Sequence, residues 1–346
     1  MSDVRISDDI LYIGVDDGDL DLFESQYIIP NGISYNSYVI LDEKVAVMDT
    51  IDARKSEEWF NNLSNVLAGR NVDYIVISHL EPDHAANIKA LSDKYPDAKL
   101  VLSAKAKAML PQFFAIDNLD DKCITVAEGQ ELSLGTHNLK FIMAPMVHWP
   151  EVMLEYETTE KVLFSADAFG KFGALSASDD WTCEARRYYF NIVGKYGAPV
   201  QTLLKKAAAL DIRTICPLHG PVLKENLEFY IGKYLTWSSY EPEDDGVLVA
   251  CASIHGNTKT AAEKMVDILK EKGFAKVAFI DLTRNDMAEA IEDAFRYSRL
   301  IVAAASYDGG VFPPMEDFLN RLSHKAYQNR KVGIIENGSW APTAGK

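Results

Sequence analysis

Six consecutive residues concentrate metal-binding side chains in this chain: His79-Leu80-Glu81-Pro82-Asp83-His84. They directly follow the apolar run Tyr74-Ile75-Val76-Ile77, which predicts a buried strand. Because Pro82 interrupts a helix, we expect the six residues to form a loop that turns two imidazoles and two carboxylates towards one point. Such a loop is suited to one metal ion or two.

Three further candidate ligands each follow an apolar, strand-like run: His148, Asp167 and His219. A single His or Asp at such a position more often caps the strand or lies at the edge of the core than binds a metal. The carboxyl ends of the strands in a sheet gather their loops at one edge, however, so four such coincidences favour a shared site. The candidates are His79, Glu81, Asp83, His84, His148, Asp167 and His219. Seven donors suffice for two metal ions bridged by Asp167, and a set of nitrogen and oxygen donors without thiolate suits iron or manganese as well as zinc.

A second constellation lies in the last hundred residues. Ser253-Ile254-His255-Gly256-Asn257-Thr258 joins an apolar strand to a helix, where backbone N–H groups and hydroxyls can hold a phosphate. The loop matches neither a P-loop nor a dinucleotide fingerprint, so a monophosphate fits better, and a plain strand–helix turn is the alternative. Two later loops, Ser306-Tyr307-Asp308-Gly309-Gly310 and Asn337-Gly338-Ser339-Trp340, each carry glycine and an aromatic side chain that could stack on a flat ring. The alternative for Tyr307 and Trp340 is an exposed aromatic without a ligand.

The elements that position these residues fall into two groups. Hairpins and strand–helix alternation over about 240 residues predict an α/β fold with two sheets sandwiched between helices. The acidic, proline-containing stretch 237–246 marks a boundary, and strands near 247–252, 276–280, 300–305 and 331–335 then alternate with helices. This alternation predicts a doubly wound parallel sheet. We therefore expect domains at 1–245 and 246–346, the second lacking a fifth strand and its helices.

Composition narrows the function classes. The chain has 346 residues and a formal charge of −16, which argues against binding nucleic acid or an anionic membrane surface. Its four cysteines form no Cys-x-x-Cys pair, so we expect neither a disulfide framework nor a rubredoxin domain. Residues 1–5 do not begin a secretory signal, and no apolar run approaches the roughly 20 residues of a membrane span, so we expect a cytoplasmic protein.

The metal motif resembles that of the metallo-β-lactamase fold, with one replacement. Most hydrolases of that fold have His at the third position of the motif, where this chain has Glu81. That replacement is typical of the flavodiiron proteins, and an anionic oxygen there favours iron over zinc. The stretches Ala144-Pro145-Met146-Val147-His148-Trp149-Pro150 and Ser165-Ala166-Asp167-Ala168-Phe169-Gly170 resemble the same family, and the last hundred residues resemble flavodoxin.

The resemblance implies a site and an activity. His79, Glu81 and His148 would hold one iron, Asp83 and His219 the other, and Asp167 would bridge them; His84 is a ligand in some relatives and is replaced by water in others. FMN would place its phosphate in the first loop and its ring between the other two. The implied reaction is reduction of O2 to water, of NO to N2O, or of both, with electrons passing through FMN from a separate rubredoxin-like or other soluble carrier. A head-to-tail homodimer, or a dimer of dimers, would bring one subunit's FMN to the other's diiron site.

Two other hypotheses are compatible with the sequence. One is a dizinc hydrolase with a flavodoxin appendage, and the other is a non-catalytic electron carrier whose first domain only docks partners. The preference for O2 or NO, the identity of the electron donor, and the retention of FMN by a chain of this length stay open.

Overall fold

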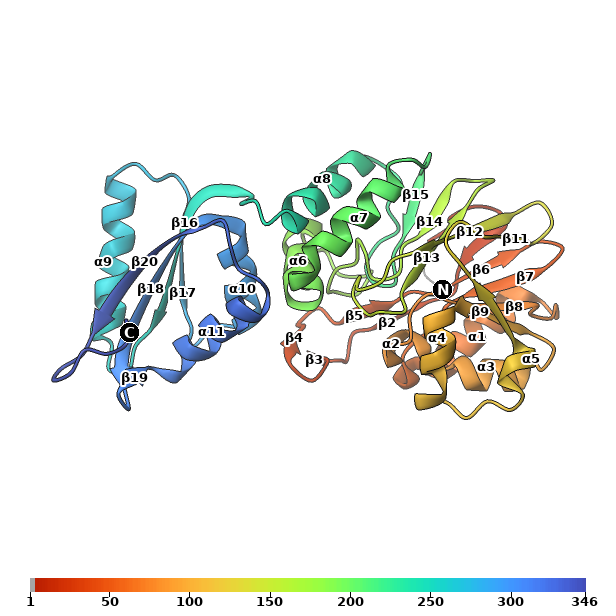
Figure 1. Ribbon diagram of the computed structural model, residues 1–346, viewed down its shortest axis with the longest axis horizontal. Helices are drawn as coiled ribbons and strands as arrows, with labels where there is room; N and C mark the ends of the chain where they lie inside the picture. The colour runs from red at the N-terminus through yellow and green to blue at the C-terminus, as the bar shows by residue number, and fades with distance from the viewer. Residues whose placement is uncertain (1–3) are drawn as a thin grey trace. The chain divides into compact units, whose positions relative to one another are not determined.

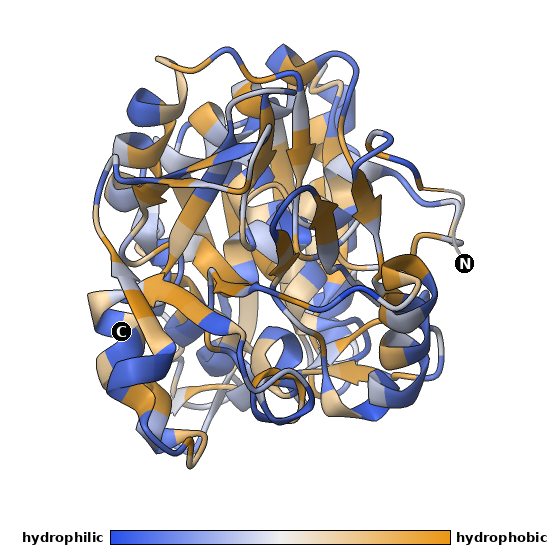
Figure 2. Cartoon of the chain, turned by 90° about the vertical axis from the view of Figure 1, so that its right-hand side faces the viewer, coloured by the Kyte–Doolittle hydropathy of each residue, from blue (hydrophilic) through white to orange (hydrophobic). Residues whose placement is uncertain are grey.

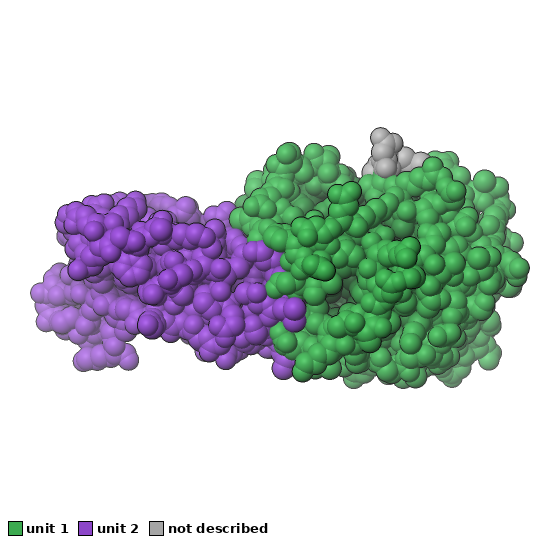
Figure 3. Space-filling view, turned by 90° about the horizontal axis from the view of Figure 1, so that it is seen from above, with its two compact units in different colours: residues 1–185, 199–232 green, residues 186–198, 233–346 purple. Residues whose placement is uncertain are grey.

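The computed structural model describes residues 4–346, and its contacts divide into two compact units (Figure 3). The first is Met1–Ala185 with Pro199–Gly232, and the second is Arg186–Ala198 with Lys233–Lys346. Compared with the boundary expected at 245/246, segments 186–198 and 233–245 belong with the second unit. Residues 1–3, on which the expectation about a secretory signal partly rests, lie outside the described residues.

Two sheets form the first unit (Figure 1). The six-stranded sheet has the order β1 (Ile10–Tyr12), β6 (Tyr38–Leu41), β7 (Val45–Met48), β8 (Tyr74–Ile77), β9 (Lys99–Ser103) and β10 (Cys123–Val126). The five-stranded sheet has the order β11 (Glu131–Ser133), β12 (Asn138–Met143), β13 (Met153–Glu157), β14 (Val162–Phe164) and β15 (Thr214–Cys216). Strands β6 and β7 form an antiparallel hairpin, and β7, β8, β9 and β10 continue in parallel.

The core of this unit lies between the two sheets. One cluster of buried side chains draws Met48 and Val76 from the first sheet and Phe141 and Phe164 from the second. Strands in the middle of such a sandwich are covered on both faces, so they carry near-continuous apolar runs. Figure 2 shows these strands in the hydrophobic colour, whereas the surrounding helices alternate between the two colours. The two-sheet fold predicted from the sequence is confirmed.

Short helices and a few small strands complete the unit. The helices are α1 (Ser56–Leu67), α2 (Pro82–Ala85), α3 (Ile88–Lys94), α4 (Ala104–Met109), α5 (Leu119–Lys122), α6 (Trp181–Tyr188), α7 (Gly197–Ala207) and α8 (Leu227–Ser238), the last three reaching into the second unit. The small strands are β2 (Val15–Asp17), β5 (Ile33–Tyr35) and the hairpin β3 (Leu22–Phe23) with β4 (Tyr27–Ile28). Helix α8 begins only at Leu227, because Leu223 bridges to Ile215 of β15.

The stretch 79–84 differs from the predicted loop. Only its first part is irregular, because residues from Pro82 form the one-turn helix α2. Proline is compatible with the first position of a helix, where its missing N–H would have no intrahelical partner. Asp83 and His84 are therefore held by helical backbone, whereas His79 and Glu81 lie on the segment between β8 and α2.

The second unit is built on one parallel sheet, as predicted. Its order is β17 (Val277–Asp281), β16 (Asp244–Ala252), β18 (Tyr297–Tyr307) and β20 (Lys331–Asn337), with the short strand β19 (Gly310–Val311) folded back on the end of β18. Helix α9 (Asn257–Glu271) covers one face, and α10 (Met287–Arg296) and α11 (Pro313–His324) cover the other (Figure 1). At the edge strand β20, the side chains of Val332 and Ile334 are 54% and 63% exposed. Across residues 4–346, no helix is long and apolar enough to cross a membrane.

Residues 186–198, which are remote in sequence from the sheet of the second unit, stabilise this unit. The ring of Phe190 stacks on Phe295 of α10 at a centroid distance of 4.1 Å. Arg186 forms an ion pair with Glu292 and a second one, of 3.0 Å, with Glu243. All three charged side chains are at most 10% exposed, so each depends on the others for compensation of its charge.

We predict that Arg186→Ala destabilises the second unit by about 3–5 kcal/mol, because it leaves two buried carboxylates without their cation. The free energy of unfolding measured in urea tests this. Arg321→Ala is the control: its partner Asp317 lies one helical turn away and is half-exposed, so its loss should cost no more than about 1 kcal/mol. Equal decreases in the free energy of unfolding of the two variants would contradict a stabilising role of the buried ion pairs of Arg186.

Candidate functional site

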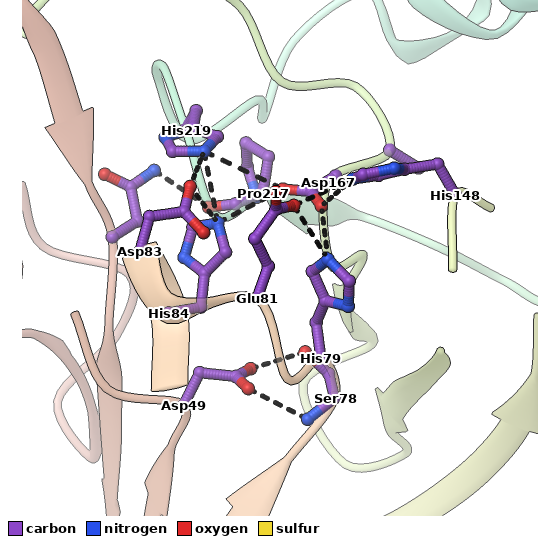
Figure 4. A network of polar contacts seen from close by, with 12 residues as sticks. Asp49, Ser78, His79, Glu81, Asp83, His84, His148, Asp167, Pro217 and His219 are labelled. Carbon is purple, nitrogen blue, oxygen red and sulfur yellow. Dashed lines mark hydrogen bonds and ion pairs between the residues drawn. The ribbon is translucent and has the colours of Figure 1, made fainter. Parts of the chain in front are cut away.

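All seven candidate ligands lie in the first unit, where strands of both sheets end. His79 and Glu81 follow β8, and Asp83 and His84 lie on α2. The other three follow β12, β14 and β15, in the order His148, Asp167 and His219. Figure 4 shows their polar ends directed towards one another around Asp167. The structure thus brings together every metal-ligand candidate from the sequence.

One oxygen of Asp167 and three other donor atoms form a first set of four. His79 Nε2 lies 3.2 Å from Glu81 Oε2 and 3.4 Å from Asp167 Oδ2. His148 Nε2 lies 3.1 Å from Glu81 Oε2 and 3.4 Å from Asp167 Oδ2. Four donors at tetrahedral positions around a metal, each about 2.0–2.1 Å from it, are about 3.3 Å apart. The observed spacings match that value.

A second set surrounds the other oxygen of Asp167. His84 Nε2 lies 3.1 Å from His219 Nε2, 3.3 Å from Asp83 Oδ2 and 3.2 Å from Asp167 Oδ1. His219 Nε2 is 3.2 Å from Asp83 Oδ2 and 3.8 Å from Asp167 Oδ1. The sequence left the direction of His84 open, and the structure points it into this set.

The unpaired polar atoms at the centre fit a metal site. Both oxygens of Asp167, one of Asp83 and Nε2 of His148 are buried without a hydrogen-bond partner within residues 4–346. Buried polar atoms of this kind are costly unless something compensates them. Two divalent cations compensate both the carboxylates and the facing imidazole nitrogens, so the residues present fit two metals.

Residues outside the two sets orient the ligands. His79 Nδ1 lies 2.9 Å from the buried Glu151 carboxylate, and His219 Nδ1 lies 2.7 Å from the backbone oxygen of Ser34. With a proton on each Nδ1, the Nε2 lone pairs are free to face a metal. Sequence reasoning missed Glu151 and Ser34, since only the fold shows that they reach an imidazole.

The electrostatics of the metal-free site follow from these contacts. Burial alone lowers the pKa of His148, but the carboxylates of Asp167 and Glu81 outweigh it and raise the pKa to about 9. Carboxylate neighbours likewise raise the pKa values of His79 and His84 against the effect of burial. Burial raises the pKa of Glu81, but His148 and His79 outweigh it and hold that pKa well below its ordinary value. Protons thus take the place of metal charge in the metal-free site.

A cavity of about 270 Å³ reaches both donor sets, through Glu81 of the first and Asp83 of the second. Its lining includes Phe23, Glu24, Tyr35, Glu81 and Asp83. The rings of Phe23 and Tyr35 lie 5.4 and 6.0 Å from that of His219. No pattern in the sequence predicted the small hairpin β3–β4, which carries Phe23 and the turn to Glu24. The cavity gives a small molecule access to these two ligands between apolar walls and charged ones, the latter including Arg54.

The second unit has a smaller pocket of about 110 Å³ at the ends of β16, β18 and β20. Of the residues expected there, Ser253, His255, Asn257, Thr258, Ser306, Asn337, Gly338 and Ser339 line it, together with Ile254 and Ala305. Gly256 caps α9 with a φ of +92°, a backbone conformation that suits glycine. The Nδ2 of Asn337 donates to Thr258 Oγ1 at 3.1 Å and joins the first loop to the third.

The remaining flavin-loop candidates are placed elsewhere. Tyr307 and Gly310 pair in the β18–β19 hairpin, with Asp308 and Gly309 at its turn. Tyr307 is 46% exposed and Trp340 is 89% exposed, and neither lines the pocket as the structure describes it. Ser306 Oγ accepts the backbone N–H groups of Thr343 and Ala344, so the segment after Trp340 folds back over this loop.

Comparisons with known proteins cover nearly the whole chain. The sequence family described as "ODP family beta lactamase" matches residues 33–220. An uncharacterized protein of Methanocaldococcus jannaschii is 30% identical over 322 residues, covering 91% of this chain and 80% of that protein. The anaerobic nitric oxide reductase flavorubredoxin of Vibrio vulnificus is 26% identical over 349 residues, covering 97% of this chain and 70% of that protein.

Solved structures agree with the fold of both units. Rubredoxin oxygen:oxidoreductase of Desulfovibrio gigas is 26% identical and has a TM-score of 0.91, covering 98% of this chain and 86% of that one. A flavoprotein of Thermotoga maritima is 27% identical, with a TM-score of 0.88 over 97% of this chain and 86% of that one. The flavodiiron protein of Giardia intestinalis has a TM-score of 0.93 at 24% identity, covering 98% of this chain and 84% of that one, and supports the fold alone. The metallo-β-lactamase-like and flavodoxin-like folds expected from the sequence are confirmed.

The two donor sets lead to different predictions for metal stoichiometry. Asp167→Ala removes a donor from both sets and should abolish tight binding of both metals, whereas His84→Ala should remove one. Anaerobic titration with Fe²⁺ measures the number bound per chain. The control is Asp97→Ala, an exposed carboxylate outside the site, which should leave two metals bound. Two tightly bound metals in Asp167→Ala would contradict a bridging role.

Stability of the metal-free protein should fall as pH rises through the range of the perturbed imidazoles. The pKa of His148 is about 9 in the folded protein, against about 6.5 when unfolded. The folded state therefore binds the proton more tightly, and this stabilisation is complete below about pH 6.5 and lost as pH approaches 9.

Urea unfolding of chelator-treated protein across this pH range tests the expectation. His148→Gln should flatten the profile, and substitution of the exposed His324 by Gln should leave it unchanged. Saturation with metal should also flatten the profile, because the metal replaces the protons. A metal-free protein whose stability rises over this range would contradict the account.

Proposed function

We infer the function of the chain from its family: it belongs to the flavodiiron proteins and is an oxidoreductase. We propose that it reduces O2 to water, NO to N2O, or both. The names of its relatives support both gases, since one is an anaerobic nitric oxide reductase and another a rubredoxin oxygen:oxidoreductase. The observation that carries the proposal is the pair of four-donor sets that meet at separate oxygens of Asp167.

We propose that these sets hold two non-haem irons. His79, Glu81 and His148 would hold one, Asp83, His84 and His219 the other, and Asp167 would bridge them. Glu81 adds an anionic oxygen where a zinc hydrolase of this fold has imidazole, which favours iron. Two ferrous ions held there would supply one electron each and a binding place for the gas. The protein fixes the ligand geometry through Glu151 and Ser34, and buries every ligand except Glu81, whose side chain is 17% exposed.

We propose FMN as the electron store of the second unit. The pocket at the ends of β16, β18 and β20 begins at the N-terminus of α9, where backbone N–H groups favour a phosphate. The hydroxyls of Ser253, Thr258 and Ser306 line the same pocket and supply further donors. Loss of the phosphate-facing hydroxyls in Ser253→Ala/Thr258→Ala should weaken FMN binding in a fluorescence titration.

The proposed reduction requires a source of electrons. We propose a rubredoxin-like or other soluble carrier as the donor, because one structural relative is named rubredoxin oxygen:oxidoreductase. The metal ligands and the flavin pocket lie in different compact units, so we further propose a head-to-tail homodimer or a dimer of dimers. Sedimentation of an active, strictly monomeric protein would contradict that assembly.

Rapid mixing of the anaerobically reduced protein with each gas tests the activity. We expect oxidation of the flavin and the metal centre by O2, by NO or by both, with water or N2O as the product. Asp83→Ala should lose this activity, because it removes a donor from the second set while leaving the flavin pocket intact. A variant that keeps every activity of the parent would favour an electron carrier, and a parent with two zincs and no iron would favour a hydrolase.

A further inference from the structure

A further group of metal-binding side chains lies in the first unit, apart from the seven candidate ligands. It consists of Asp9, His137 and Glu160, each of which offers one donor atom within 4.8 Å of the others. Asp9 directly precedes β1, His137 directly precedes β12, and Glu160 lies in the turn between β13 and β14. Since β1 belongs to the six-stranded sheet and the other strands to the five-stranded sheet, the group joins the two sheets.

This group lies at the opposite edge of the sandwich from the ligands around Asp167. Strands β12 and β14 are both antiparallel to β13, so they run in the same direction. His137 and Glu160 come before these two strands, whereas His148 and Asp167 follow them. The six residues of β12 span roughly 20 Å, at about 3.3 Å per residue. The two sites are therefore separate and share no ligand.

The imidazole of His137 is buried without a good hydrogen bond. The residue is 2% exposed. Within residues 4–346, Nδ1 has no hydrogen-bond partner, although Glu157 Oε1 lies 3.2 Å away. Nε2 lies 3.5 Å from Asp9 Oδ2, which is longer than a usual hydrogen bond. Because buried polar atoms normally have partners, this imidazole requires a further one.

Three carboxylates gather around this imidazole. Glu157 is 0% exposed, and its two oxygens accept the backbone N–H groups of Thr159 and Glu160 at 2.8 and 2.7 Å. Glu160 is partly buried, and the side chain of Asp9 is 55% exposed. In the described part of the chain, no lysine or arginine forms an ion pair with any of the three. Negative charge concentrated in this way is stabilised by a cation.

The backbone fixes the positions of two of the donors. The backbone oxygen of Asp9 accepts the N–H of Leu41 at 2.9 Å. Asp42, the next residue in the turn between β6 and β7, accepts the backbone N–H of His137 through Oδ2 at 2.6 Å. One turn of the first sheet thus holds both Asp9 and His137, so their approach does not depend on flexible side chains alone.

We propose that Asp9, His137 and Glu160 bind a zinc ion that links the two sheets. One imidazole nitrogen and two carboxylate oxygens are donors that zinc accepts, with water as a fourth ligand. The 3.5 Å between His137 Nε2 and Asp9 Oδ2 is close to the spacing of about 3.3 Å between tetrahedral ligands. A metal on Nε2 leaves the proton on Nδ1, beside the Glu157 carboxylate, and this arrangement is usual for metal-binding imidazoles.

The effect of the ion is on stability, and it does not depend on the function proposed above. Its three ligands are distant in sequence and meet only in the folded chain, so the ion binds the folded state and stabilises it by mass action. The site has three protein donors, one of them largely exposed. It therefore binds metal more weakly than the two donor sets joined by Asp167.

Calorimetric titration with Zn²⁺ tests the site. The Asp167→Ala protein is used, because the two donor sets at Asp167 would otherwise compete for the same ion. Adding His137→Gln should reduce the number of zinc ions bound per chain by one, or weaken that binding by about tenfold or more. Glu160→Gln and Asp9→Asn should each do the same. Asp8→Asn is the matched control, since Asp8 is exposed, adjacent to Asp9 and outside the group, and it should keep the ion.

Thermal unfolding of the iron-loaded protein, with and without Zn²⁺, gives a second measurement in the presence of an intact Asp167. Zinc should raise the melting temperature of the parent and of Asp8→Asn. It should not raise that of Asp9→Asn or Glu160→Gln. These two changes replace side chains that are exposed or partly buried, so the variants should fold even if the change at the buried His137 disturbs folding.

Two results would overturn the proposal. Zinc binding that keeps its affinity and stoichiometry in His137→Gln, Asp9→Asn and Glu160→Gln would show that the ion binds elsewhere. A parent whose melting temperature does not change with zinc would show that no ion links the sheets. Neither result affects the function proposed above, because these three residues are not among the ligands around Asp167.

Discussion

The carboxylate of Asp167 sets the constraint that the rest of the first unit satisfies. It is 1% exposed, and its two oxygens face two different groups of imidazole and carboxylate donors. A buried carboxylate in this position requires positive charge on both sides. The donors that position that charge come from the ends of β8, β12 and β15 and from α2, so the two sheets must close with these ends at one place. The core between the sheets, with aromatic residues such as Phe141 and Phe164, holds them in that register.

The two compact units divide the proposed chemistry. The first holds all of the candidate metal ligands, and the second holds the pocket at the N-terminus of α9 that we propose for the FMN phosphate. Glu81 distinguishes the first unit from zinc hydrolases of this fold. It places an anionic oxygen where those enzymes have imidazole, and such an oxygen favours iron.

The sequence predicted the residues with strong local signals and missed those that depend on tertiary contacts. The apolar runs before His79, His148, Asp167 and His219 predicted their gathering at strand ends, because a strand end fixes where the next residue lies. The direction of His84 could not be predicted, because it depends on the one-turn helix that Pro82 begins. Glu151 and the Ser34 carbonyl reach the imidazoles only through the fold. The packing of residues 186–198 on α10 joins segments about a hundred positions apart, and no local pattern encodes it.

Anomalous diffraction from crystals of protein purified without oxygen, recorded at the iron and zinc absorption edges, tests the central claim most directly. The account predicts two iron peaks per chain, one on each side of the Asp167 carboxylate. The first peak should be bound by His79, Glu81 and His148, and the second by Asp83, His84 and His219. The account would be contradicted by a single metal, by a pair of zincs, or by two irons that are not both bound by Asp167.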